Sequence, residues 1–391
     1  ISGMVNVAVL YQPEGQPQIQ RLDIPLSFAH IEEAHGIDKN SVCFVRCRVA
    51  EMCARAVNSR KVSVTARLCI EMTVYQPAEL QYTEQIQPED TGLQVQYDTQ
   101  ELTLISAVHG DTFTILDDLE WTNADGLELV HTDCQLRLQE NRAMHGRLLL
   151  RGEAQLTLLL QDDTNTLQQV TKSIPFQQII EIDSLTEGEK TGVRLAVRSL
   201  DVALTAIGML SVGIGVETAV LREEKHHLQT VHDLYHIGYD LQVQAVPVTV
   251  CGCTLCGGFS ADGSETVPLG MKTTQFLGAK AVCTGIQAEG DQRYAKIEAS
   301  ILYYDEENCP YQTHRALRVP LHHTMQEMDT VWDASVQTTL SPSGEDSVNL
   351  IFSLNGMLCR QPRTAFQDVT AAAYGEARTP PDAAMILRRV D

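Results

Sequence analysis

The feature that most constrains this chain is a strand-like pattern that occurs three times. The runs are GMVNVAVLYQPEG (3–15), GEAQLTLLLQDDT (152–164) and AKIEASILYYDEE (295–307), and each one ends in a polar turn. Within the first run, Val5 and Val9 fall on the same side of an extended chain. Alternation with a period of two is typical of a β-strand that buries one face. The pattern therefore predicts a chain rich in β-structure.

Two further landmarks follow each run in the same order. The first is an apolar pair around a proline, at Pro25, Pro175 and Pro320. Proline has no N–H to donate to a β ladder, so it indicates an edge strand or the start of a strand. The second is a long alternating segment, which reads KVSVTARLCIEMTVY (61–75), MLSVGIGVETAVL (209–221) and SVNLIFSLNGMLC (347–359). Three landmarks in one order, at a period too long for a solenoid, predict tandem domains.

We therefore predict an all-β fold of three tandem β-sandwich-like modules, with additional linking strands and a few short helices. The predicted boundaries are 1–92 for module 1, 93–238 for a linking β segment plus module 2, and 239–391 for a linking β segment plus module 3. Module 1 is expected to be truncated at its N-terminus, because the chain opens in strand rhythm without an initiating Met. Short helices are expected at 27–36 and 367–375, each ending at a glycine.

Composition narrows the classes of partner. The formal net charge is −22, from 51 acidic and 29 basic residues, so the surface repels phosphate backbones and anionic membranes. No run of 18 uncharged apolar residues or secretory signal occurs, and we expect neither membrane insertion nor nucleic-acid binding. The 11 cysteines are odd in number and several lie in apolar runs, which favours a reducing compartment.

Motifs for catalysis are incomplete. The segment GGFSAD (257–262) lacks the last glycine of a nucleophile elbow, and Gly213 and Gly215 lack the third glycine of a dinucleotide fingerprint. The acidic runs within 163–168, 187–190 and 344–347 lack the spacing of a calcium loop and indicate turns. We therefore expect no enzymatic activity, no catalytic residues and no cofactor.

A zinc site is the sharpest alternative to a purely structural role. The candidate ligands are His232, His236, Cys251, Cys253 and Cys256, since imidazole and thiolate are the ligand types of zinc. Their spacing departs from a standard zinc knuckle, and an H-x3-H pair ligates well on a helix, whereas this stretch has no helical periodicity. The opposing interpretation is buried cysteines at a strand end and solvated histidines, so we assign no metal to these residues.

The order of the landmarks resembles the SPOCS domain family, found in spore-coat and related proteins of endospore-forming Firmicutes. The first copy matches best, and the third is the most diverged because Ala295 replaces the glycine. The matching residues are Gly3–Tyr11, Ile24–Pro25 and Asn58–Leu68 in the first copy, Gly152 and Ile174–Phe176 in the second, and Val319–Leu321 in the third. Members often end in a LysM module, and the segment 372–391 is similar to the lead-in to one.

This resemblance implies a cellular setting rather than a reaction. It implies a non-catalytic structural or protein-interaction protein of spore coat assembly, located in the mother-cell cytoplasm at the forespore surface. The expected partners are other coat or envelope proteins, with self-association as a further option. The alternative is a cell-wall or glycan-binding module that acts with a LysM module outside this chain.

Overall fold

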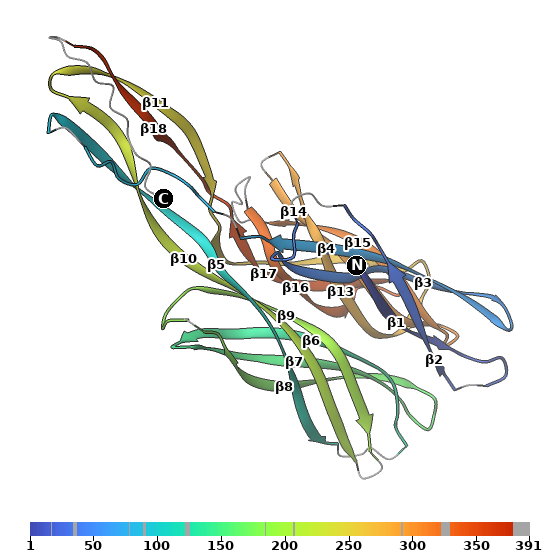
Figure 1. The fold of residues 1–391 in the computed structure, drawn as a ribbon. Coiled ribbons are helices and arrows are strands. Elements are labelled where there is room, and N and C mark those ends of the chain that lie inside the picture. Colours follow the sequence, from blue (N-terminus) through green and yellow to red (C-terminus); the bar gives the residue numbers. More distant parts are fainter. Residues whose placement is uncertain are drawn as a thin grey trace.

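The computed structural model describes residues 1–16, 18–33, 37–77, 79–88, 91–121, 126–183, 185–205, 208–290, 292–321 and 329–377. Within these ranges every helix or strand assigned is a β-strand, 18 in all, arranged in several small sheets (Figure 1). The predicted all-β class is therefore confirmed. No helix capable of crossing a membrane is found in the described part of the chain.

The middle of the chain forms two three-stranded sheets that share a core. One sheet has the order β6-β7-β8 and the other β5-β10-β9. Their bounds are Leu93–Glu120 for β5, Glu128–Met144 for β6, Arg147–Gln161 for β7, Leu167–Glu181 for β8, Thr191–Leu204 for β9 and Met209–His236 for β10. Leu156 and Leu158 of β7 and Ile214 of β10 are fully buried in one cluster between the sheets. The alternating side chains of the central strands thus meet face to face, as in a layered β structure.

The last third repeats this arrangement. Sheet β13-β14-β15 shares a core with sheet β12-β17-β16. Their bounds are Thr254–Pro268 for β12, Thr273–Glu289 for β13, Gln292–Asp305 for β14, Pro310–Leu321 for β15, Asp329–Pro342 for β16 and Ser347–Arg360 for β17. Ile297 and Ile301 of β14 and Leu354 of β17 are buried in this core.

The first 75 residues form two separate two-stranded ribbons. Strand β1 (Ser2–Tyr11) pairs with β2 (Gln20–Ala29), and β3 (Val42–Asn58) pairs with β4 (Lys61–Tyr75). Both pairs are antiparallel. Val7 and Val9 of β1 are buried, but β3 and β4 bury none of their side chains fully.

A narrow arm projects from the rest of the molecule (Figure 1, upper left). It combines the first half of β5 with the second half of β10, next to the ribbon of β11 (Tyr239–Cys251) and β18 (Arg363–Ala377). The side chains between these pairs form one apolar cluster that includes Val231, Leu234 and Val369. The predicted linking β segments thus correspond to real strands.

The two predicted helices are wrong. Residues 27–29 finish strand β2, 30–33 form no helix, and 34–36 lie outside the described residues. Residues 367–375 belong to β18, where Ala371 pairs with Gln244 and Ala373 with Gln242. Helix propensity is a weak preference, and the hydrogen-bond ladder offered by β11 overrides it.

The three landmark prolines lie on edge strands, as predicted. Pro25, Pro175 and Pro320 belong to β2, β8 and β15, each of which has a single neighbour in its sheet. An edge strand leaves half of its N–H groups outside the ladder, so proline costs little there.

A glycine opposite a phenylalanine is a repeated packing unit. Gly3 pairs with Phe28 and Gly152 with Phe176, so each aromatic ring can cover the bare backbone across the ladder. A Cβ added at Gly152 would lie 2.5 Å from both Phe176 Cζ and the Arg137 carbonyl oxygen. In the third copy the pair is Ala295 and Val319, where the smaller partner leaves room for a methyl group.

We expect Gly152→Ala to lower the free energy of unfolding by about 1–3 kcal/mol, because the new methyl group overpacks this site. Adding Phe176→Val should recover part of the loss, since the double variant imitates Ala295 and Val319. Urea denaturation of the single and double variants measures this coupling. Gly213→Ala is the matched control, because its added Cβ would meet no atom closer than 3.6 Å. Equal losses in the Gly152 and Gly213 variants would contradict the explanation.

Candidate functional site

Strands β3, β4, β9 and β16 converge at a junction of one cation with three aromatic rings. Phe44 and Trp332 meet edge to face at 6.1 Å between ring centroids, and Tyr75 lies 6.4 Å from Trp332. Arg194 Cζ lies 4.8 Å from the Trp332 centroid and 5.6 Å from that of Phe44. Arg194 is almost completely buried, so these rings stabilise a cation that has left water. The β3–β4 ribbon is held to the rest of the molecule here.

Ion pairs surround the junction. Arg46 contacts Asp333 at 2.8 Å and donates to the Ala334 carbonyl at 3.1 Å. Arg48 donates to the Cys283 carbonyl and to Glu71, the latter at 3.3 Å. Burial raises the pKa of the Asp333 carboxyl, and the charges of Arg46 and Arg194 oppose that rise. Burial also lowers the pKa of Arg48, as does the like charge of Arg46.

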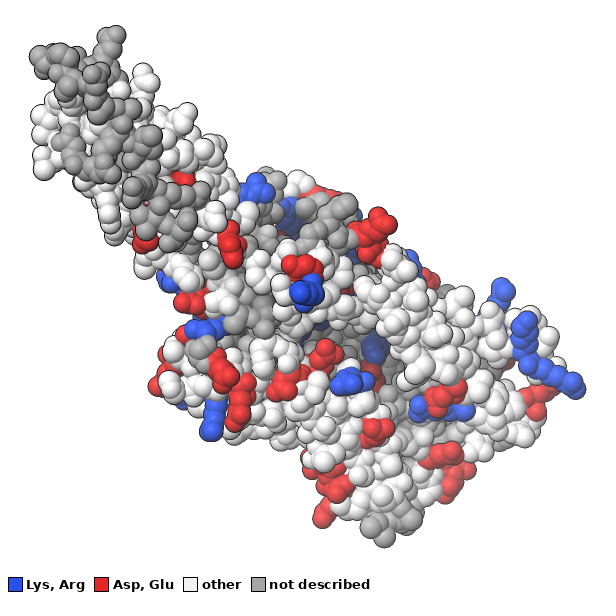
Figure 2. All heavy atoms as spheres, in the orientation of Figure 1, with Lys and Arg blue, Asp and Glu red and all other residues white. Residues whose placement is uncertain are grey.

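A cavity of about 500 Å³ opens beside this network, between the sheets of the middle and the last third. Figure 2 shows the face hollowed there, with basic side chains nearby. Arg46, Arg48 and Lys280 line the cavity. Each has a carboxylate partner, namely Asp333, Glu71 and, for Lys280 at 2.6 Å, Asp133. Arg137 also lines the cavity. Three of the four bases at this cavity are therefore held in ion pairs within the protein and form a structural network.

The five candidate zinc ligands are spread along the molecule. His232 is exposed on β10, whereas His236 is buried with its ring 4.8 Å from Tyr239 and 5.1 Å from Tyr374. Cys251 is exposed at the end of β11, and Cys253 and Cys256 are half-buried. Among the described residues, these five do not form a group of three or more ligand atoms within metal-binding distance.

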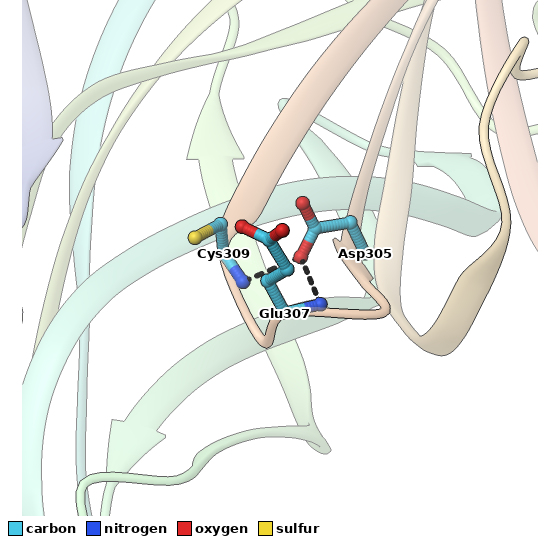
Figure 3. A group of neighbouring side chains, drawn as sticks. All are labelled: Asp305, Glu307 and Cys309. Carbon is cyan, nitrogen blue, oxygen red and sulfur yellow. Dashed lines mark hydrogen bonds between the residues drawn. The ribbon is translucent and has the colours of Figure 1, made fainter.

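The group that does come together is Asp305, Glu307 and Cys309, in the turn between β14 and β15 (Figure 3). One Asp305 carboxylate oxygen accepts hydrogen bonds from the backbone N–H of Glu307 at 2.9 Å and of Cys309 at 2.7 Å. Asp162 makes the same two bonds to Thr164 and Thr166 in the turn after β7. The carboxylate therefore closes the turn, which explains the cluster without a metal.

The ribbons of residues 1–75 differ from the rest of the molecule in how much apolar surface they expose. Of the 21 exposed large apolar residues in the described chain, 10 lie here: Ile1, Met4, Tyr11, Leu22, Ile31, Ile37, Val42, Val45, Val57 and Val62. The end of the β3–β4 ribbon around its turn also carries the exposed bases Arg55, Arg60 and Lys61. Figure 2 shows basic side chains at the right-hand end of the molecule. Exposed apolar side chains in such number favour an interaction surface in this part of the chain. These open ribbons are the candidate functional site.

Sequence reasoning found the strands of this site but missed its openness and its junction. The alternation in 3–15 and 61–75 matches that of the buried copies, so nothing in these runs distinguishes an exposed strand from a covered one. Arg194 and Trp332 are isolated in the sequence and meet only through the packing of β9 on β16.

Comparison with protein-family models, with curated proteins and with solved structures gave no match to this chain. The proposed function therefore rests on the sequence and the geometry of the chain itself.

We expect Trp332→Ala to loosen the β3–β4 ribbon, because it removes the ring shared by Phe44, Tyr75 and Arg194. The free energy of unfolding should fall by about 3–5 kcal/mol. Limited trypsin digestion should cleave faster at Arg55, Arg60 and Lys61. Tyr311→Ala, at an exposed ring, is the control. An unchanged cleavage rate would show that the junction does not hold the ribbon.

Burial and the neighbouring Asp133 raise the pKa of the Cys134 thiol to about 12. The reactive thiolate is then almost absent at pH 8, and its share should grow about tenfold for each pH unit up to pH 10. Iodoacetamide labelling followed by mass spectrometry, with the exposed Cys251 as internal reference, measures this dependence. A Cys134 rate that levels off near pH 9 would contradict the raised pKa.

Proposed function

We propose that this chain is a non-catalytic structural protein that joins other proteins into an assembly through its open N-terminal ribbons. The observation that carries the proposal is that residues 1–75, about a fifth of the sequence, hold 10 of the 21 exposed large apolar residues of the described chain. Burying such surface against a partner contributes about 25 cal/mol for each Å² removed from water.

The proposal includes three tandem β-sandwich-like modules. A contact between corresponding residues supports it. Leu10, Leu159 and Leu302 occupy the same position in the three repeated runs, and all three belong to one apolar cluster. Contact between equivalent positions of the three runs favours three copies of one structural module. The modules would then form a platform that holds the open ribbons in a fixed orientation.

The chemistry of the polar groups also favours a structural role. Three of the four bases that line the central cavity are paired with carboxylates, and Asp305 closes a turn. A catalytic site would need a nucleophile or base directed at a substrate position. In this proposal the polar groups of the junction orient one β unit against the next.

The resemblance to the SPOCS family supplies the proposed setting, which is the spore coat, built on the mother-cell side of the forespore surface. The formal net charge of −22 fits protein partners better than nucleic acid in that setting. Coat or envelope proteins, and further copies of this chain, are the proposed partner class.

Binding to purified coat-layer proteins tests the proposal. We expect saturable binding to at least one of them, and Val45→Lys should weaken it about tenfold or more by placing a charge in the apolar contact. Ile351→Lys is the matched control, because Val45 exposes 43% and Ile351 exposes 44% of its surface, and Ile351 lies on β17, outside the open ribbons. Absence of binding, or equal loss in both variants, would refute the proposal.

A further inference from the structure

We infer that the open edges of β1 and β4 receive a pair of β-strands from a polypeptide segment outside residues 1–391, with the apolar alternation of β12 and β13. This inference deepens the proposed function, on which it rests, by naming the chemistry of the partner. Such strand addition supplies main-chain hydrogen bonds along the edge, while side-chain pockets select the sequence.

The first step is the difference between β1 and its counterparts. The run 3–15 corresponds to 152–164 and 295–307, which form most of β7 and β14. Strand β7 lies between β6 and β8, and β14 lies between β13 and β15. Within the described chain β1 pairs with β2 alone, so the edge that faces β6 or β13 in the other copies is open.

The same difference separates β4 from β10 and β17. Strand β10 has β5 and β9 as neighbours, and β17 has β12 and β16, whereas β4 pairs only with β3 in the described structure. Burial follows this pattern. Val62 at the start of β4 exposes 37% of its surface, while Leu210 and Val348, at the starts of β10 and β17, expose none.

The order of the strands along the chain indicates that the added segment would consist of two consecutive strands. In both complete copies the missing neighbours are consecutive in the chain: β5 is followed by β6, and β12 by β13. One of the two strands joins each sheet, so a single two-stranded segment would fill both edges. Within the described residues both such segments are already paired. Strand β5 pairs with β10 and β6 with β7, while β12 pairs with β17 and β13 with β14. The occupant therefore comes from outside these residues.

The pairings of β6 with β7 and of β13 with β14 indicate which side chains an added strand would need beside β1. Val7 corresponds to Leu156 and Ala299 in the repeated runs. These residues pair with Cys134 and Ala281, so a small residue is expected opposite Val7. Two residues further along the added strand lie Leu136 and Cys283, which predicts a second apolar residue on the same face.

Strand β1 lacks the features that normally protect an edge. Natural edge strands are blocked by charged residues, proline or bulges. Residues 2–11 contain neither a charged residue nor a proline, and the pairing of β1 with β2 has no register shift. A strand with these properties is suited to accept a neighbour.

The test uses the full chain and a synthetic peptide of residues 254–289, which contains β12 and β13. We expect saturable binding, with amide hydrogen exchange in β1 and β4 slowed about tenfold or more. The control peptide carries Ala281→Lys and Cys283→Lys, which place charges on the buried face, and it should bind at least about tenfold more weakly.

Unchanged exchange in β1 and β4 at saturating peptide would overturn the inference. So would a free chain that dimerises with these amides already protected, because a second copy would then be the occupant. Binding of coat-layer proteins is measured on the same samples. Coat binding without any effect of the peptide rejects the added strand pair and leaves the proposed function standing. Slowed exchange with the peptide but no coat binding supports the added strand pair and rejects the proposed function.

Discussion

The structure depends on one requirement of β-strands, which is that both backbone edges and the apolar face need cover. Strands β7 and β14 meet it fully, since each has a neighbour on both sides and a facing sheet that buries its alternate side chains. Strand β1 carries the same alternation, but it has a neighbouring strand, β2, on one edge only in the described structure. Because an uncovered edge is also a binding surface, the same requirement links the fold to the proposed assembly role.

The junction of β3, β4, β9 and β16 shows how an acidic chain can hold cations in its interior. Arg194 lies against aromatic rings, and Arg46 and Arg48 have carboxylate partners. Removing one partner of such a network leaves an uncompensated buried charge, which costs more than the pair contributes. The network therefore favours one arrangement of the sheets. That arrangement sets the orientation of the open ribbons relative to the rest of the molecule.

The sequence predicted the fold class and the position of most strands because alternation directly encodes which face is buried. It also placed Pro25, Pro175 and Pro320 on edges, since a missing N–H can be deduced from the residue type. It failed at 367–375, where a closing glycine suggested a helix and pairing with β11 produced a strand. For the site, it gave the strands of the open ribbons without their exposure, because exposure depends on neighbours that are distant in the chain.

The sequence by itself determined that three similar strand-like runs occur and that each run ends in a polar turn, because period and turn chemistry are local properties. Only the tertiary structure decided which edges stay open, that Arg194 meets Trp332, and that Asp305 closes a turn instead of joining a distant ligand set. The physical reason is that hydrogen-bond partners and burial in a β protein come from strands far apart along the chain. Their pairing is settled by the packing of whole sheets.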